Sequence, residues 1–521
     1  MKTLSLCEKI GQRLVIGFPG TEPDEDFFQL VHRYKVGNVT LFRENIVDEK
    51  QLAELCGRLR SVIEKETGYP PFLTIDQEGG VVTRLPDEET NIPGAMALAA
   101  TGDPENAYRM GLVTAARLRD CGVNFNFAPD MDVNCNPDNP VIGVRSFSDD
   151  PGTVAAYGSA MLRGLLDGGV YACLKHFPGH GDTAVDSHVG LPCVDKSLEE
   201  LEKTELVPFR AGIAAGAPAV MSSHILFPQL EPKRLPATMS RAVMTGILRE
   251  RLGFDGLIVS DCMEMQAIKA YYGTVNGVLA AMGAGVDLVL ISHTAGLAME
   301  AAEKAAAAVK DGALSAEEMD ASVARILAHK RRCAAMEPKE PVPDASRCRE
   351  SVRAVREKTI TAVQMPAGGI PPLGEDPLFL GCRDYRSTPV SNNGSSGFNF
   401  PAEMRKRAGF GAALVTPKDP TAGEISDIMK EAVRHSGLVL GMYNGHILKG
   451  QMRLAKALAR TGLPMVAVAL RDPYDLAGLP EHVAALAAWE YSRPAFDALW
   501  PVVGGRRAPA GKLPLNSFPS A

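Results

Sequence analysis

Short apolar runs alternate with longer amphipathic segments throughout the first 335 residues. The runs, rich in β-branched residues, occupy 14–18, 36–42, 71–76, 123–130, 170–177, 219–225, 256–261 and 286–292. Between them, apolar positions recur with a helical period, as in 48–65, 104–120, 151–167, 199–215, 239–252 and 264–283. This alternation is typical of parallel strands joined by crossover helices. Eight such units in about 300 residues predict a (β/α)8 (TIM) barrel over residues 1–335.

A second, smaller domain is predicted after the barrel. Three prolines interrupt any regular pattern in 336–347, which we interpret as a linker. The remainder, 348–521, begins with a helical stretch at 348–365 and continues with strand-like runs at 378–382, 412–417, 437–443, 464–470 and 483–489. These runs predict an α/β domain with an open sheet, of the αβα-sandwich type.

Composition and charge narrow the class of partner. The 521 residues carry a formal net charge of −7, with a pI near 5.9. We therefore expect a small neutral or polar ligand, and neither a nucleic acid nor a membrane, as partner. No apolar run approaches the roughly 20 residues of a membrane span, and charged residues interrupt the apolar start of the chain before it reaches signal-peptide length. Ten cysteines without a CxxC motif indicate free thiols. These features predict a cytoplasmic protein.

Polar side chains gather where the predicted barrel strands end. Six of the runs finish at charged or histidine residues: Asp76 and Glu78, Asp130 and Asp132, Lys175 and His176, His224, Asp261, and His293. Each alone has an ordinary structural explanation, such as a helix N-cap for Asp261. In a TIM barrel, however, the carboxyl ends of all strands meet at the face that carries the active site. Their convergence therefore predicts an active site at that face.

The densest polar segment is 175–188, with the sequence KHFPGHGDTAVDSH. Its glycines and proline exclude a helix, so we expect an arm that extends over the barrel mouth. His176, His180 and His188, together with two aspartates, are ligand types that a zinc or dimetal hydrolase uses. Against that chemistry, Lys175 and nearby arginines would repel a dication, and the first strand ends without an HxH motif. We therefore expect no metal and no cofactor.

A second interpretation of the same arm pairs Asp186 with His188, two residues later. The carboxylate would orient and charge the imidazole, as in a catalytic dyad. An imidazole with a pKa of about 6.5 can donate and accept a proton near neutral pH. This arrangement suits general acid/base catalysis.

Four motifs in this order carry a family resemblance. The segments IDQEGGVVTR (75–84), GVRSF (143–147), KHFPGHGDTAVDSH (175–188) and IVSDCMEM (258–265) resemble the β-N-acetylhexosaminidase branch of glycoside hydrolase family 3. The tail RAPAGKLPLN (507–516) is similar to the closing segment of that family's second domain. The resemblance covers most of the chain and is weak between 340 and 500.

The resemblance implies a retaining exo-β-N-acetylglucosaminidase that acts by double displacement. Asp261 would be the nucleophile, and His188, held by Asp186, the acid/base. The family's sugar-binding positions correspond here to Asp76, Arg84, Arg145, Lys175 and His176. Glu78 and His180 would support these residues without reacting, while His224 and His293 have no assigned role.

Several functions stay open on the sequence alone. Cytoplasmic members of this branch are associated with recycling of cell-wall fragments, which implies terminal N-acetylglucosamine on muropeptides, or a related β-glycoside, as substrate. Phosphorolysis is the nearest alternative, with phosphate in place of water and the same aspartate and histidine. A metal-dependent barrel hydrolase and an inactive sugar-binding protein are further alternatives, although the second would more naturally have lost Asp261 or His188. The loops that would bind the aglycone have no recognisable pattern.

Overall fold

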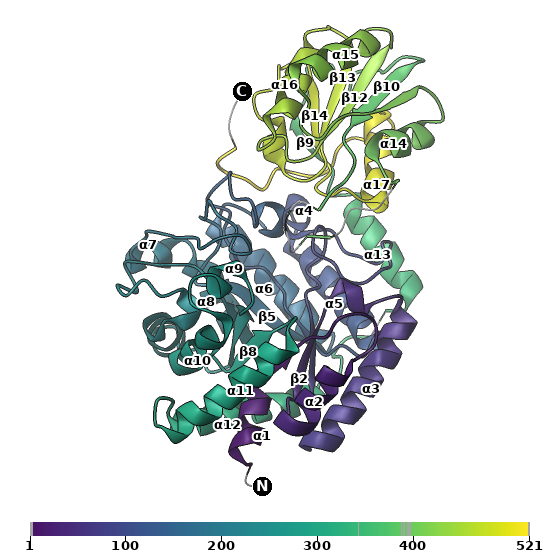
Figure 1. Ribbon diagram of the computed structural model, residues 1–521. Coiled ribbons are helices and arrows are strands. Elements are labelled where there is room, and N and C mark those ends of the chain that lie inside the picture. The colour runs from purple at the N-terminus through teal and green to yellow at the C-terminus, as the bar shows by residue number, and fades with distance from the viewer. Residues whose placement is uncertain (1–3, 342, 387, 389–390, 393–396, 519–521) are drawn as a thin grey trace.

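The computed structural model describes residues 4–341, 343–386, 388, 391–392 and 397–518 (Figure 1). Eight parallel strands close into a barrel in sequence order: β1 (Leu14–Ile16), β2 (Asn38–Leu41), β3 (Phe72–Ile75), β4 (Phe125–Asn126), β5 (Tyr171–Phe177), β6 (Ala219–Ser222), β7 (Leu257–Cys262) and β8 (Leu288–Ile291). Each predicted run of the first 335 residues coincides with one of these strands, and β7 extends one residue past its run. The predicted (β/α)8 fold is therefore confirmed.

Helices surround the barrel, and short polar residues cap many of them. The layer contains α1 (Leu6–Arg13), α2 (Glu25–Tyr34), α3 (Glu49–Thr67), α5 (Pro104–Asp120), α6 (Pro151–Asp167), α7 (Leu198–Lys203), α8 (Leu206–Ala214), the π-helical Ala242–Arg251, α9 (Gln266–Lys269), α10 (Thr274–Ala284), α11 (Ala295–Lys310) and α12 (Ala316–Ala334). Asp103 and Asp150 each accept a backbone N–H in the first turn and precede a proline at the first helical position. A cap followed by proline fixes where α5 and α6 begin.

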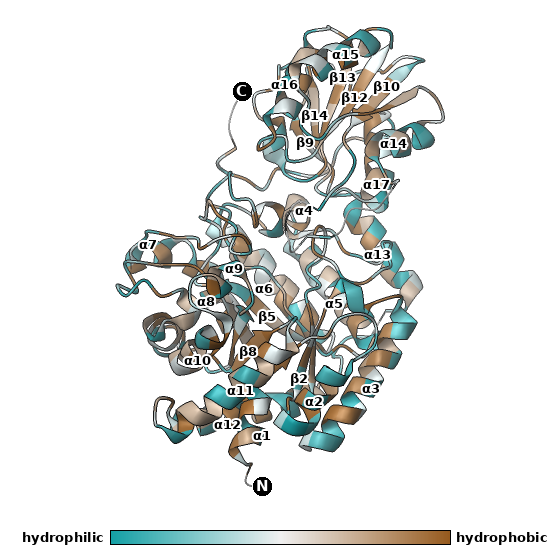
Figure 2. Ribbon diagram, viewed as in Figure 1, coloured by the Kyte–Doolittle hydropathy of each residue, from teal (hydrophilic) through white to brown (hydrophobic). Residues whose placement is uncertain are grey.

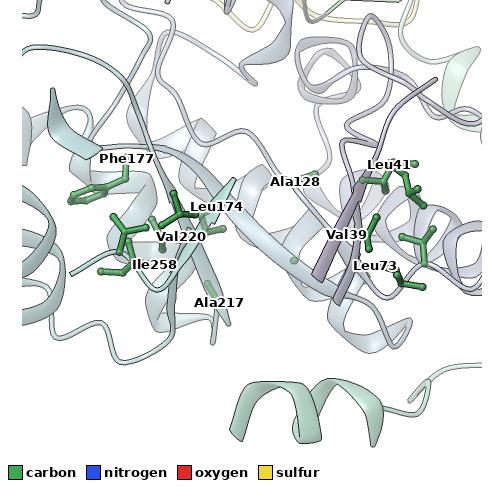
Figure 3. Packing of buried hydrophobic residues seen from close by; sticks show 14 of the residues in the cluster. Val39, Leu41, Leu73, Ala128, Leu174, Phe177, Ala217, Val220 and Ile258 are labelled. Atoms are coloured by element: carbon green, nitrogen blue, oxygen red, sulfur yellow. The ribbon is translucent and has the colours of Figure 1, made fainter. Parts of the chain in front are cut away.

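The barrel strands are buried on both faces, which explains their continuous apolar sequences. Side chains such as Phe72, Phe125, Tyr171 and Leu257 fill the barrel interior. Alternate positions point outward, and Val39, Leu73 and Val220 lie in the core beneath the helices (Figure 3). Figure 2 shows the same division, with brown strands inside helices that carry teal outer faces. The carboxyl ends of the strands are consequently held by a rigid core.

The second domain is a six-stranded open sheet with helices on both faces. Its strands are β9 (Thr361–Gln364), β10 (Pro377–Gly381), β11 (Ala412–Val415), β12 (Gly437–Met442), β13 (Met465–Ala469) and β14 (Ala484–Ala487), in the order β11-β10-β12-β13-β14-β9. Only β9 is antiparallel to its neighbour. One face packs on α14 (Phe400–Ala408) and α17 (Arg493–Val503), the other on α15 (Ala422–Ala432) and α16 (Lys449–Ala459). The predicted αβα arrangement is confirmed.

The segment between the domains differs from its predicted structure. Helix α13 (Ala345–Arg356) begins inside the predicted linker, and β9 lies inside the predicted helical stretch 348–365. Cys348, Val352 and Val355 on α13 belong to the core of the barrel domain. Because β9 is only four residues long, its pattern was too short to separate from the helix before it. The limits 335 and 348 for the domains stay a prediction.

An apolar cluster and a C-terminal strap join the domains. Met96 and Ala97 of α4 (Ala95–Ala100) pack with Ala487 and Trp489 of the second domain. Residues 511–517, here called the strap, bond to both domains: Gly511 N–H donates to Ile360 O at 2.9 Å, Lys512 N–H to Ala100 O at 2.8 Å, and the amides of Asn516 and Ser517 to the carboxylate of Asp149 at 2.8 and 2.7 Å. In the described part of the chain, no helix is both long and apolar enough to cross a membrane.

Candidate active site

A cavity of about 840 Å³ opens at the carboxyl ends of the barrel strands and extends to the second domain. Seven of the eight predicted site residues line it: Asp76, Arg84, Arg145, Lys175, His176, His188 and Asp261. The eighth, Asp186, lies behind His188 and contacts its ring. The barrel therefore brings together residues that are up to 185 positions apart in the sequence, from 76 to 261.

Asp261 lies near the end of β7, where the strand presents its carboxylate to the cavity. Its Oδ1 accepts the backbone N–H of Cys262 at 2.7 Å. Burial alone would raise the pKa of Asp261, but the nearby histidines, His224 foremost, lower it below its usual range. The carboxyl group is therefore ionised at neutral pH, the state that a nucleophile or an electrostatic stabiliser requires.

The Asp186–His188 pair has the geometry of a dyad. Oδ1 of Asp186 accepts both Nδ1 of His188 and its backbone N–H, each at 2.8 Å. Because this carboxylate faces Nδ1, that nitrogen carries a proton and Nε2 is the atom left for chemistry. The side chain of His188 is 23% exposed and that of Asp186 is 8% exposed. The imidazole thus meets the cavity while its partner stays buried.

A network of ion pairs lies beneath the cavity. Nζ of Lys175 contacts Asp76 Oδ1 at 2.7 Å and Glu78 Oε1 at 2.6 Å. Arg145 forks onto Glu78, with Nε at 2.9 Å from Oε2 and Nη2 at 2.8 Å from Oε1. Burial opposes the charge on Glu78, yet Arg145 and Lys175 hold the pKa of its carboxyl far below the usual range. Glu78 therefore positions two cations that line the cavity.

His176 and His180 are held by one carboxylate. Asp132 accepts Nδ1 of His176 at 2.7 Å and the backbone N–H of His180 at 2.6 Å. Despite complete burial, these two histidines lower the pKa of Asp132 to about 2. The His180 ring bonds to Thr183 and Ser187 at 2.9 and 3.0 Å, and burial lowers its pKa to about 4. His180 therefore braces the arm as a neutral group, while His176 lines the cavity.

The described residues contain one possible cation site, which differs from the histidine set of the rival metal-hydrolase interpretation. Asp130, Asp132 and His176 place one ligand atom each within 4.8 Å of one another, whereas the trio His176, His180 and His188 forms no such group among the described residues. Arg145 Nη2 lies 3.6 Å from Oδ2 of Asp130. A guanidinium at that distance already supplies the positive charge that a metal would bring, so the donor set fits a metal poorly.

Sequence reasoning missed the contribution of the second domain. The cavity is also lined by Asp384, Arg386, Asn392, Glu490 and Tyr491, which follow strands β10 and β14. No motif marks these positions, because they become part of the site only through docking of the domains. The two unassigned histidines are placed as well. Nε2 of His224 bonds to Cys262 O at 3.0 Å, next to Asp261, and the ring of His293 packs at a tilt against Phe42, both of which line the cavity.

Comparison with known proteins agrees with this architecture. Residues 5–329 match the family described as "Glycosyl hydrolase family 3 N terminal domain". A solved glycoside hydrolase family 3 β-N-acetylglucosaminidase from Paenibacillus sp. str. FPU-7 shares 37% identity and superposes with a TM-score of 0.90 over 100% of both chains.

Curated relatives match a little over half of the chain. A β-hexosaminidase of Xylella fastidiosa (strain M23) is 38% identical over 286 residues, which are 54% of this chain and 83% of the relative. β-Hexosaminidase A of Pseudoalteromonas piscicida is 36% identical over 320 residues, or 55% of this chain, and the match spans about half, 54%, of that longer relative. The family match covers more than half of the chain, and the fold agrees throughout. The predicted family is confirmed: the chain belongs to glycosyl hydrolase family 3 and is a glycoside hydrolase.

Proposed function

We propose that the chain is a retaining exo-β-N-acetylglucosaminidase. One observation carries the proposal: an ionised aspartate, Asp261, and a carboxylate-paired histidine, His188, line the same cavity. Retaining glycosidases need one group that attacks the anomeric carbon and another that protonates the leaving oxygen. The printed names of the similar proteins, β-hexosaminidase and β-N-acetylglucosaminidase, support an N-acetylglucosaminyl donor.

In the first step, Asp261 attacks the anomeric carbon as the bond from that carbon to the aglycone oxygen breaks. We assign the attack to Oδ2, because Oδ1 already accepts the amide of Cys262. His188 gives its Nε2 proton to the departing oxygen, and Asp186 stabilises the imidazolium that exists before the transfer. The products are a glycosyl ester on Asp261, a neutral imidazole and the free alcohol.

In the second step, the neutral Nε2 of His188 removes a proton from water. That water attacks the anomeric carbon, the ester bond to Asp261 breaks, and the sugar leaves with its original configuration. A histidine suits this exchange because its basic form is neutral and adds no second anion beside Asp261.

The ion-pair network supplies the sugar-binding groups of the proposal. Asp76 offers carboxylate oxygens, and Lys175, Arg84 and Arg145 offer hydrogen-bond donors at the buried bottom of the cavity. Charge-assisted bonds to hydroxyls and to the N-acetyl group would fix the sugar relative to Asp261. His176, oriented by Asp132, completes this set.

We propose terminal N-acetylglucosamine on cell-wall fragments as the natural substrate, cut in the cytoplasm. The proposal follows from the family resemblance and from the net charge and cysteine usage of the chain. A direct test compares chromogenic β-N-acetylglucosaminide, β-glucoside and a GlcNAc-containing muropeptide as substrates. Cleavage of the glucoside alone would contradict the proposed donor.

The same assay separates water from phosphate as the acceptor. Run with and without phosphate, the enzyme should release free N-acetylglucosamine in both buffers. A sugar 1-phosphate formed in phosphate buffer would show phosphorolysis instead, with Asp261 and His188 in unchanged roles.

The nucleophile can be identified by trapping. A 2-fluoro glycosyl donor slows the second step, so mass spectrometry should find the label on the peptide that contains Asp261. Asp261→Ala should lose at least about 10³-fold in kcat, as expected for a covalent nucleophile, while Asp255→Ala, an exposed carboxylate just before the same strand, should be unchanged. A label on another peptide would contradict the assignment.

Removal of metal ions tests the rival chemistry. Because Arg145 lies beside the one candidate ligand group in the described chain, we expect prolonged dialysis against a chelator to leave kcat/KM unchanged. Loss of activity that zinc or manganese restores would favour a metal-dependent hydrolase.

A further inference from the structure

Each domain faces the other with the edge of its sheet at which proteins of that fold bind ligands. Active sites of barrels lie at the carboxyl ends of the strands, and open α/β sheets bind ligands outside the carboxyl ends of theirs. Asp384 and Arg386 follow β10, and Glu490 and Tyr491 follow β14, so these loops extend from the carboxyl edge of the second sheet. All four residues line the cavity that contains Asp261.

The segment after β10 is fixed to its own domain by Tyr385. The ring of Tyr385 packs at right angles to Tyr443, at 4.9 Å between centroids, and Nζ of Lys418 lies 3.8 Å above its centre. Its hydroxyl accepts Nδ2 of Asn444 at 3.1 Å. Asp384 and Arg386, the neighbours of this anchored tyrosine, therefore have a defined position over the cavity.

Asn392 fixes the same loop to the barrel. Its Oδ1 accepts the backbone N–H of Thr83 at 2.8 Å, and its Nδ2 donates to Thr83 Oγ1 at 3.0 Å. Its own N–H donates to Val81 O at 3.0 Å. Thr83 directly precedes Arg84, so the second domain is bonded to the barrel segment that carries a predicted sugar-binding residue.

The loop after β10 approaches the cavity on the side of Arg84. Asn392 bonds to Thr83, the residue before Arg84, and the charge of Arg386 acts on Arg84 together with the charges of Asp76, Glu78 and Arg145. The charge of His188, where the leaving group departs in the proposed mechanism, acts on Asp261. We therefore place Arg386 toward the end of the terminal sugar that carries its free hydroxyls.

We propose that Asp384 and Arg386 complete the sugar pocket from the second domain, binding hydroxyls at the non-reducing end of the terminal sugar. This inference rests on the proposed glycosidase function. A carboxylate and a guanidinium two residues apart offer an acceptor and a forked donor, a combination that recognises hydroxyl groups. The second domain thereby determines specificity for the end of the sugar, whereas the barrel performs the reaction.

The test removes the protein group and the substrate group separately and together. The variants are Arg386→Ala, Asp384→Asn and the control Arg383→Ala, which deletes an exposed arginine of the same segment that does not line the cavity. Each is assayed as the full chain with nitrophenyl β-N-acetylglucosaminide and its 4-deoxy and 6-deoxy analogues. Bonds between charged groups and hydroxyls predict a loss of about 10–10²-fold in kcat/KM for Arg386→Ala on the parent substrate.

If Arg386 or Asp384 binds a hydroxyl, the loss for that variant should be much smaller on the analogue that lacks this hydroxyl. Arg383→Ala should behave like the wild type on all three substrates. The inference would be overturned if Arg386→Ala and Asp384→Asn each lost activity equally on all three substrates, or lost none. Because the enzyme would still cleave the parent substrate, the proposed glycosidase function would be unaffected. A wild-type chain that cleaves none of the three would overturn both.

Discussion

Glu78 lies between Arg145 and Lys175, and these side chains carry much of the buried charge below the cavity. Breaking a buried ion pair by removing one partner typically costs about 3–5 kcal/mol, because the other charge stays uncompensated. The network is consequently a rigid unit. Its ion pairs fix the cations in one arrangement, which suits recognition of a sugar in one orientation.

The role proposed for His188 predicts a dependence on the leaving group. His188→Ala should lose on the order of 10²–10⁴-fold in kcat/KM with a sugar alcohol as leaving group, the usual worth of general acid catalysis. A nitrophenolate departs without a proton, so cleavage of a nitrophenyl glycoside should lose much less. Asp186→Asn should show the same trend more mildly, since the imidazole stays and only its orienting charge is lost.

The measurement is kcat/KM of the three proteins with both classes of substrate. Ser187→Ala is a suitable comparison, because it alters the neighbouring bond to His180 and leaves the dyad in place. Equal losses of His188→Ala on both classes would mean that His188 serves binding or arm structure instead.

Lys330 predicts how stability depends on pH. Its Nζ donates to Gln12 Oε1 at 2.6 Å and Gly37 O at 2.9 Å, and burial lowers its pKa from 10.5 to about 7. Between these values the unfolded chain holds a proton that the folded chain releases. The contribution of Lys330 to stability therefore rises as the pH increases from 7 to 10.5, by a few kcal/mol in all.

Lys330→Met removes this contribution to the pH dependence of stability. The hydrogen bonds that the variant loses change its stability by an amount that does not depend on this titration. The unfolding free energy of the variant minus that of the wild type should therefore fall steadily between pH 7 and 10. Urea unfolding of both proteins at three pH values gives this difference in unfolding free energy. The contributions of other titrating groups are the same in both proteins and cancel. A difference that stays constant would show that Lys330 is charged in the folded protein.

At the scale of elements, the hydrophobic pattern was sufficient to predict the strands that are buried on both faces. The eight barrel strands and β10, β12, β13 and β14 of the second sheet stand out because both of their faces are covered. The edge strand β11 was also predicted, although it is partly exposed. Strand β9 was missed, since four residues at the sheet edge adjacent to a helix give no separate periodicity. Helices were placed well but not always as single pieces, as in 199–215, which forms α7 and α8.

The predicted site residues come from four short motifs, and the barrel topology explains why these motifs meet at one cavity. The contacts between Glu78, Lys175 and Arg145 depend on side-chain packing across strands and could not be read from spacing. Asp384 and Arg386 carry no pattern at all, because their place in the cavity depends on how two domains dock. The sequence was sufficient to select residues that share one cavity, but not to show that the second domain encloses it.

At the scale of the whole molecule, the contact between α4 and β14 predicts a shared dependence of stability and activity. Ala97 is 2% exposed among apolar residues of both domains. Ala97→Glu would bury a charge there without touching either domain core. We expect calorimetry to show the two domains unfolding at more widely separated temperatures, and kcat/KM to fall because second-domain residues line the cavity.

The matched control for this variant is Ala422→Glu, which adds the same charge at the exposed start of α15. It should change neither the thermogram nor kcat/KM. An unchanged thermogram for Ala97→Glu would mean that the apolar cluster contributes little to the joining of the domains.

The strap and the second domain also give the site an order of assembly during synthesis. Domains generally fold as units while the chain is made, the N-terminal one first. Asp261 and His188 belong to the barrel, whereas Asp384, Arg386 and Glu490 lie in the later domain. The strap, which bonds to Ile360, Ala100 and Asp149, lies after α17. A nascent chain can therefore hold the reacting groups on a folded barrel before the second domain encloses the cavity.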